Sequence, residues 1–254
     1  MIEYTTSQEI AGLILEPILV PGGMIVPSER WIRGIREIAD KWKALLIFDE
    51  CQLAPSRTGN LWGFQRYDVT PDIITFGKGM SAGLAVCGTA TTREIADECS
   101  GKKGLPWSGT YPQDPMACAV ALKQLQIVLR DNITARAAEL GEILVTRLNT
   151  LKERHPCIGD IRGAGLYRML DIVSDPETRK PDPALAERIR REALAEGLVM
   201  IAVKNYMRIC PPLIITEQEI DDIVGRLDCA ITRAMANHST GIDFSHSSSL
   251  AADN

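Results

Sequence analysis

Two short apolar runs, each followed by a charged residue, constrain the fold of this chain most. The run ALLIFD, residues 44–49, ends in Asp49, and the run IITF, residues 73–76, comes just before Lys78. Continuous apolar runs bounded by polar residues are typical of strands buried on both faces, as in a parallel sheet. Ligands of such sheets bind at the carboxyl ends of the strands, so Asp49 and Lys78 are predicted to face one crevice. An acid and an amine there suit a cofactor whose ring nitrogen needs an opposite charge and whose carbonyl needs a nucleophile.

The segments around these runs predict an α/β fold with a mostly parallel sheet. Apolar runs at residues 13–16 and 84–90 predict two further strands. Between the first two strands, apolar residues recur at helical spacing over residues 31–42, and Ser28 is a plausible N-cap. A strand, a helix and a strand at this spacing form a βαβ unit, which places the two strands parallel.

The second half of the chain predicts a smaller α+β domain. Asp114 and Pro115 suit the N-cap and first position of a helix. The last helix is marked by a capping box of Thr216 and Glu219 and by an apolar stripe over residues 220–234. The expected organisation is the C-terminal part of a large domain over 1–130, a connecting helix over 131–154, a small α+β domain over 155–237 and a disordered, serine-rich tail over 238–254.

Composition excludes several classes of protein. The net charge of −5 argues against nucleic acids and anionic membranes as partners, and no apolar stretch approaches the roughly 20 residues of a spanning helix. Seven scattered cysteines without a CxxC pair indicate reduced thiols, and with no signal peptide at the N-terminus they favour a cytoplasmic protein. Three isolated histidines cannot form a zinc site, and the lack of GxGxxG after a strand disfavours a nicotinamide dehydrogenase.

Longer motifs carry a resemblance to a known enzyme family. DECQLAPSRTG, residues 49–59, and DVTPDIITFGKGMSAGL, residues 68–84, resemble the aspartate and lysine segments of class III aminotransferases. The resemblance extends over residues 11–235, and among family members the 2,2-dialkylglycine decarboxylases look most similar, through segments such as EPILVPGGMI and RICPPLIITEQEID. It implies the type I fold of pyridoxal-phosphate enzymes and amino-group transfer between an amino acid and a 2-oxo acid, with decarboxylation of dialkylglycines as an added activity.

The resemblance implies roles for three residues around the cofactor. Lys78 would bind the cofactor aldehyde covalently and shuttle a proton, which requires a neutral amine in a partly desolvated site. Asp49 would keep the ring nitrogen protonated, and Gln52 would hydrogen-bond the phenolic oxygen. Taken alone, Lys78 would be a surface lysine after a strand, whereas a carboxylate directly after five apolar residues is costly unless it is paired.

Further roles are implied for the phosphate, a cation and the substrate. Thr110 would bind the cofactor phosphate across a homodimer interface. Asp114, with main-chain oxygens of Thr110 and Pro112, would bind an alkali cation, K⁺ or Na⁺, and it can serve as a helix N-cap at the same time. Arg208 would grip the substrate carboxylate, and Glu16 would pair with it when no second carboxylate is bound.

The remaining motif residues indicate structure, and one departure leaves the function open. Arg57 and Arg162 resemble structural members of their motifs, and Gly163 and Gly165 suit tight turns. The first part of the family's large domain, with its phosphate-binding Gly/Ser turn and ring-stacking aromatic, has no counterpart, so an N-terminally truncated frame with an exposed sheet edge is expected. An active enzyme and a non-catalytic remnant, or half of a split enzyme that needs a partner chain, therefore both stay open.

Overall fold

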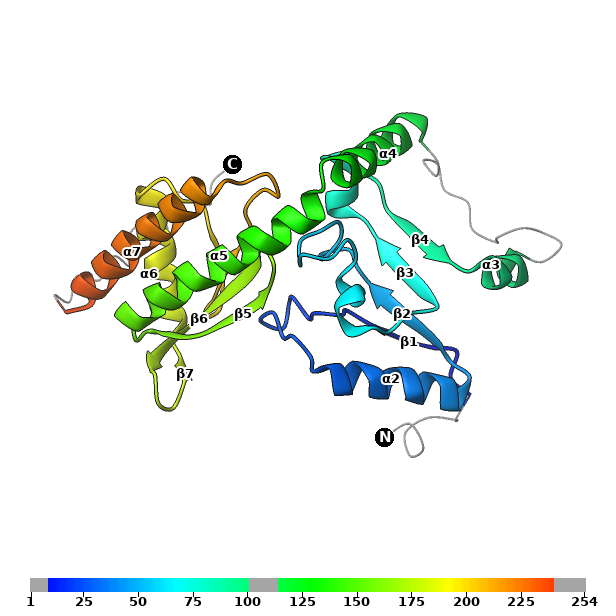
Figure 1. Ribbon diagram of the computed structural model, residues 1–254. Helices are drawn as coiled ribbons and strands as arrows, with labels where there is room; N and C mark the ends of the chain where they lie inside the picture. The colour runs from blue at the N-terminus through cyan, green and yellow to red at the C-terminus, as the bar shows by residue number, and fades with distance from the viewer. Residues whose placement is uncertain (1–8, 101–113, 240–254) are drawn as a thin grey trace, which may run out of the picture. The chain divides into compact units, whose positions relative to one another are not determined.

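The computed structural model describes residues 9–100 and 114–239, with side chains described as far as residue 236 (Figure 1). The chain divides into two compact units. The first unit takes in Met1–Val145, Arg162–Met169 and Cys210–Thr216, and the second takes in Thr146–Ile161, Leu170–Ile209 and Glu217–Asn254. Thr110 and Pro112 lie outside the described residues, as do residues 240–254 of the predicted tail.

The first unit is built on a four-stranded sheet in which three strands are parallel. Its strands follow the order β1 (Gly12–Leu15), β2 (Leu45–Asp49), β3 (Ile73–Phe76) and β4 (Gly88–Thr91). The pairs β1–β2 and β2–β3 are parallel, which confirms the predicted βαβ unit and the mostly parallel sheet. The strand predicted over 84–90 is corrected to β4, which pairs antiparallel with β3. The connection over residues 77–87 is too short for the crossover that a parallel strand requires.

The helix predicted between the first two strands is α2 (Glu29–Trp42), and it packs against the sheet (Figure 1). Ser28 is its N-cap, as predicted, because its hydroxyl accepts a hydrogen bond from the Trp31 amide at 3.3 Å. The apolar side of the helix joins the sheet in one buried cluster, which contains Ile32, Ala39, Leu46, Phe48, Tyr67 and Val69. Burial of this cluster fixes the sheet on which the predicted crevice depends.

Three further helices follow in the chain. They are α3 (Arg93–Ser100), α4 (Pro115–Arg130) and α5 (Ile133–Arg154), and a short 3₁₀ segment, η1 (Gly63–Tyr67), precedes β3. Asp114 caps α4, with its Oδ1 accepting from the Ala117 amide at 2.8 Å, so this prediction is confirmed. Asp131 and Asn132 separate α4 from α5.

The second sheet follows the order β5-β6-β9-β8, with β7 beside β6. Its elements and the helices between them are β5 (Ile158–Ala164), β6 (Tyr167–Asp175), β7 (Lys180–Pro181), α6 (Pro183–Ala195), β8 (Ile201–Val203), β9 (Tyr206–Ile209) and α7 (Glu217–Ser239). In the second unit α6 and α7 pack against each other (Figure 1). The predicted apolar stripe of the last helix is buried, for example at Ile220, Leu227 and Ile231. The helix continues through Ser239, two residues into the predicted tail.

Close backbone contacts join three segments of the first unit. Gly165, in the turn between β5 and β6, has a φ angle of +53°, which confirms its predicted role as a turn glycine, whereas Gly163 lies within β5 with a φ angle of +116°, so its predicted turn role is corrected. A Cβ atom added at Gly165 would lie 2.5 Å from the carbonyl carbon of Thr58. One added at Gly141 of α5 would lie 2.5 Å from Gly165. The β5–β6 turn is therefore held between the 57–59 turn and α5.

In the part of the chain that the structure describes, no helix is both long enough and apolar enough to cross a membrane.

Candidate active site

Four of the predicted site residues lie at one edge of the first sheet. Glu16 directly follows β1, Asp49 is the last residue of β2, and Gln52 lies in the turn after it. Lys78 follows β3 at the start of a 3₁₀ segment, η2 (Lys78–Ser81). Because β1, β2 and β3 are parallel, with Leu15 level with Phe48 and Asp49 level with Thr75, these ends share one edge. The residues thus gather at the carboxyl ends of the parallel strands, the edge at which the sequence predicted a crevice.

Glu16 links this group through hydrogen bonds and charge. Its Oε2 accepts from the Gln52 side-chain nitrogen and from the Val20 amide, each at 3.4 Å. Burial raises the pKa of the Glu16 carboxyl, and the negative charge of Asp49 raises it further. The hydrogen bonds and the positive charge of Lys78 only partly offset this rise. Glu16 therefore interacts with each of the other three residues, and Asp49 also interacts with Lys78.

The pKa of Asp49 is lowered, whereas that of Glu16 is raised. Burial alone would raise the pKa of Asp49, but hydrogen bonds from Cys51 and Thr75 and the charge of Lys78 outweigh burial, so the pKa lies below its ordinary value. The Cys51 amide donates to Asp49 Oδ1 at 3.0 Å. Asp49 is consequently ionised at neutral pH. Two carboxylates whose pKa values are pushed apart by their surroundings are typical of sites that divide acid and base roles.

Lys78 stands on an unusual backbone turn. Its φ angle is +47°, in the left-handed region that costs a non-glycine residue about 1–2 kcal/mol. The turn is held by the Gln124 side chain, which donates to the Gly79 carbonyl, and by the Ser81 hydroxyl, which donates to the Leu84 carbonyl. Backbone strain that the surroundings maintain is concentrated at functional sites. The expectation of a partly desolvated amine needs correction, since Lys78 is exposed among the described residues.

Several contacts at the site were not predicted from the sequence. Thr75 is the register partner of Asp49 and hydrogen-bonds its carboxylate. A polar residue inside an apolar run was the available signal for Thr75. The hydroxyl of Tyr167 donates to Gln52 Oε1 at 3.4 Å, a contact between segments too far apart in sequence for any local pattern to reveal.

Glu50, beside Asp49 in the chain, has a structural role. It is fully buried, and its carboxylate oxygens accept from the Gly63 and Phe64 amides, each at 2.8 Å. These amides begin η1, where a negative charge is favourable. Burial nevertheless raises the pKa of Glu50 above its ordinary value. The adjacent acids Asp49 and Glu50 thus face different surroundings, and only Asp49 belongs to the group with Lys78.

The predicted roles of Thr110, Pro112, Asp114 and Arg208 stay predictions. Asp114 is an exposed helix N-cap, and the two residues predicted to complete its cation site, Thr110 and Pro112, are outside the described ranges. Arg208 is half-buried in β9 and belongs to the second unit. Its predicted contact with a substrate carboxylate stays a prediction.

The two arginines interpreted as structural make main-chain contacts within the first unit. Arg57 donates through its guanidinium to the Pro211 carbonyl. Arg162 donates from Nε to the Gly23 carbonyl at 2.9 Å. Contacts of this kind between segments distant in sequence agree with the structural interpretation of both residues.

Comparison with known proteins places this arrangement in context. The sequence model of the family described as "Aminotransferase class-III" matches residues 1–231. A taurine–pyruvate aminotransferase of Bilophila wadsworthia is 34% identical over 241 residues, covering 88% of this chain and 52% of the relative. An alanine/serine racemase of Pyrococcus horikoshii is 34% identical over 226 residues, covering 88% and 46%. A solved Bacillus anthracis aminotransferase has a TM-score of 0.87 at 35% identity, covering 91% of this chain and 54% of that one. The chain thus spans about half the length of the relatives it matches.

Proposed function

The chain belongs to the class III aminotransferase family, and from this premise we propose that it acts in pyridoxal-phosphate-dependent transfer of an amino group between an amino acid and a 2-oxo acid. The observation that carries the proposal is the grouping of Glu16, Asp49, Gln52 and Lys78 at the carboxyl ends of parallel strands. Relatives with different names match the chain at 34% identity, among them a taurine–pyruvate aminotransferase and an alanine/serine racemase. The proposal therefore rests on the site and not on any one relative.

The residues present fit the ring of pyridoxal phosphate. Asp49 carries a negative charge at neutral pH and suits a protonated pyridine nitrogen. Lys78, on the neighbouring strand end, supplies an amine for the aldehyde. When bound, the cofactor supplies an electron sink for the bond that breaks at the substrate carbon. For its phosphate the candidate is Thr110, proposed to act from a second copy in a homodimer.

The contacts of Gln52 orient its side-chain amide. Its Oε1 accepts from the Tyr167 hydroxyl, and its Nε2 donates one hydrogen to Glu16. An amide nitrogen carries two hydrogens, so one donor is left to face the phenolic oxygen of the cofactor ring. Glu16, whose pKa is raised, holds this geometry in place. Glu16 and Tyr167 are in this respect positioning residues for Gln52.

Lys78 is proposed to move the proton at the substrate carbon. With the cofactor bound, the Lys78 amine would take a proton from one carbon and deliver it to another. The negative charge on Asp49 would stabilise a positively charged ring nitrogen of the cofactor. Arg208 is the proposed partner of the substrate carboxylate, since a guanidinium binds carboxylates through two parallel hydrogen bonds. Decarboxylation of dialkylglycines is a finer proposal that rests on the sequence resemblance alone.

Cofactor uptake tests this function directly. We expect the purified chain to turn yellow with pyridoxal phosphate and, after borohydride reduction, to carry a pyridoxyl mass on the peptide that contains Lys78. Lys43 and Lys123 are both exposed, so the peptides that contain them serve as internal controls for non-specific labelling. A mass increase spread evenly over all three peptides, or none at all, would contradict the assigned role of Lys78.

A second candidate function is that of a partial enzyme that requires another polypeptide. The observations that favour it are the exposure of Lys78 and of Ile14, whose side chain on edge strand β1 is 66% exposed. Unpaired apolar edges are typical surfaces for association. Cofactor that binds only after a chain homologous to the other half of the relatives is added would support this alternative.

The proposed cation site gives a prediction about salt. If Asp114 helps to bind K⁺ or Na⁺, replacing potassium by lithium should lower turnover severalfold, because the smaller ion fits poorly into a site of hard oxygen ligands. Asp114→Asn should remove this dependence without lowering stability, since asparagine is an equally good N-cap. Steady-state rates in potassium, sodium and lithium chloride, with a melting curve for the variant, measure both effects. Equal rates in all salts would leave Asp114 as an N-cap only.

A further inference from the structure

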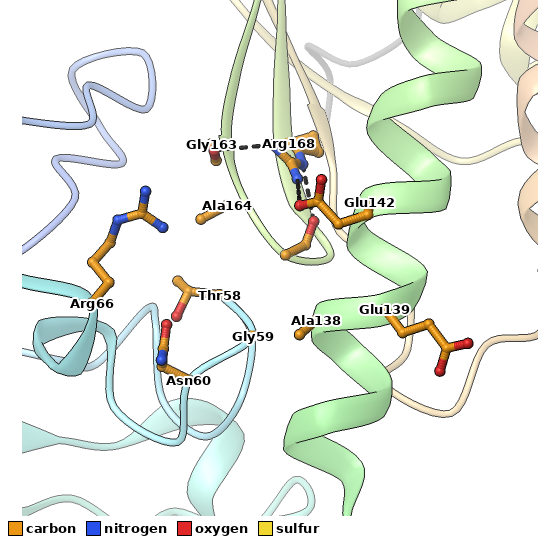
Figure 2. A pocket seen from close by; sticks show the side chains of 11 residues that line it. Thr58, Gly59, Asn60, Arg66, Ala138, Glu139, Glu142, Gly163, Ala164 and Arg168 are labelled. Atoms are coloured by element: carbon orange, nitrogen blue, oxygen red, sulfur yellow. Dashed lines mark hydrogen bonds and ion pairs between the residues drawn. The ribbon is translucent and has the colours of Figure 1, made fainter.

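The first unit contains an open cleft of about 390 Å³ that the proposed reaction does not use (Figure 2). Its walls are the turn over residues 58–60, η1, α5 and the β5–β6 turn. The cleft lies on the other side of β6 from the candidate active site. Tyr167 hydrogen-bonds Gln52 of that site, and the next residue, Arg168, lines the cleft. Successive residues of a strand point to opposite faces of the sheet.

Arg168 places a buried positive charge in one wall. It is only 7% exposed, and its guanidinium donates to the carbonyls of Gly165 at 2.9 Å, Gly163 at 3.1 Å and Gly141 at 3.1 Å. Three neutral carbonyls orient the group without neutralising its charge. The carboxylate paired with it, on Glu142, lies 3.8 Å away and is 81% exposed, so water screens it strongly. Two of the five guanidinium hydrogens are left for other acceptors.

A second guanidinium faces the same space. Arg66, on η1, reaches into the cleft from the side opposite α5 (Figure 2). Burial lowers the pKa of Arg168, and the like charge of Arg66 lowers it further, against the opposing effect of Glu142. In the described residues Arg66 stacks on the Tyr67 ring at 5.6 Å, and no carboxylate pairs with it. Two like charges across a confined space are stabilised when an anion lies between them.

The buried hydroxyl of Thr58 is a second, independent indication that the cleft binds a ligand. The residue is 4% exposed, lines the cleft, and its Oγ1 has no hydrogen-bond partner among the described residues. Buried hydroxyl groups nearly always have a partner, which is a protein group, a water molecule or a ligand. Asn60 lies beside Thr58 and provides a further amide at the same wall (Figure 2). The cleft thus offers donors from several directions.

We propose that this cleft binds a small tetrahedral oxyanion, a phosphate group, held by Arg66, Arg168 and the Thr58 hydroxyl. A cation would meet two guanidinium groups, and an apolar ligand would leave the hydroxyl without a partner. Of the acids at the rim, Glu139 points away from the cleft in Figure 2, and both Glu139 and Glu142 are exposed to water. Donors from three walls suit the oxygens of a tetrahedral group better than the two oxygens of a planar carboxylate.

The test measures binding of inorganic phosphate to the cofactor-free chain by calorimetry at constant ionic strength. We expect Arg66→Gln to weaken binding about tenfold, because it removes one charge-assisted hydrogen bond. Arg30→Gln, which removes an exposed arginine from α2, is the matched control and should leave binding unchanged. Thr58→Val keeps the shape of the side chain, and should weaken phosphate binding while leaving the melting temperature without phosphate equal or higher.

Acetate and glycerol 3-phosphate complete the experiment. Weaker binding of acetate supports a tetrahedral group, and equal binding of acetate overturns that part of the proposal. Tighter binding of glycerol 3-phosphate, with the same dependence on Arg66, identifies a phosphorylated metabolite as the source, whereas equal binding identifies free phosphate. No heat of binding from phosphate, or equal weakening by Arg66→Gln and Arg30→Gln, overturns the site.

Discussion

Lys78→Ala is expected to lower any transamination by this protein at least about 10³-fold, because positioned proton transfer alone contributes roughly 10²–10⁴. The variant also removes the amine that would hold the cofactor. The substitution leaves the backbone cost unchanged, since alanine at a φ angle of +47° meets the same steric restriction as lysine. The loss can therefore be attributed to the amine and not to the fold. Steady-state rates of the variant and of Lys123→Ala, an exposed lysine on α4, give the comparison.

A second measurement separates the covalent role of Lys78 from a structural one. The Lys78→Ala protein should melt at the same temperature as the parent protein and should show no borohydride-stable label on the peptide over residues 73–84. Turnover that survives in this variant would show that another group moves the proton. A label that appears elsewhere at full stoichiometry would show that another lysine holds the aldehyde.

The parts of the fold that the sequence predicts are those written in local patterns. The strands at 45–49 and 73–76 appear as continuous apolar runs, and the caps Ser28 and Asp114 appear as single residues before a helical period. The direction of β4 was not predictable in the same way. A run of apolar letters is identical for parallel and antiparallel strands, and only the short connection over residues 77–87 decides between them.

Some residues of the candidate site could be predicted from local patterns, and others could not. Asp49 and Lys78 were predicted together because parallel strands end at one edge, and that rule needs only the order of elements. Thr75 and Tyr167 were missed, since their contacts with Asp49 and Gln52 depend on register and on a strand far along the chain. The exposure of Lys78 was not foreseen either. Exposure depends on what covers an edge, and the local sequence does not contain that information.

The phosphate cleft shows a further limit of reading a sequence alone. Thr58 and Gly165 belong to motifs that were interpreted as structural, and their positions do form a close backbone contact. The same contact brings Arg168 against Thr58 and Arg66 in one cleft. A pattern that specifies packing can thus specify a binding surface at the same time, and only the assembled first unit reveals the second use.

Gly141→Ala is expected to destabilise the first unit by about 2 kcal/mol or more. The loss is expected even though alanine has a higher helix propensity than glycine. Gly141 lies within α5, where alanine would gain about 1 kcal/mol over glycine in open space. Its Cβ would lie 2.5 Å from both Cα and the carbonyl carbon of Gly165. These are backbone atoms, so no flexible side chain can move aside, and overpacking typically costs about 1–3 kcal/mol. Gly165 cannot retreat, because it packs against Thr58 on its other side.

Gly34→Ala is the matched control in the same unit. Gly34 lies in α2, and a Cβ there would meet nothing within 4 Å, so this variant should gain up to about 1 kcal/mol. The two variants make the same chemical change within a helix, and the sign of the effect differs only through the neighbours of each glycine. Urea unfolding, compared at unchanged m-value, measures both free energies. If Gly141→Ala proves as stable as Gly34→Ala, the close contact between α5 and the β5–β6 turn does not exist. The hydrogen bond from Arg168 to the Gly141 carbonyl, which depends on this contact, would then be in question as well.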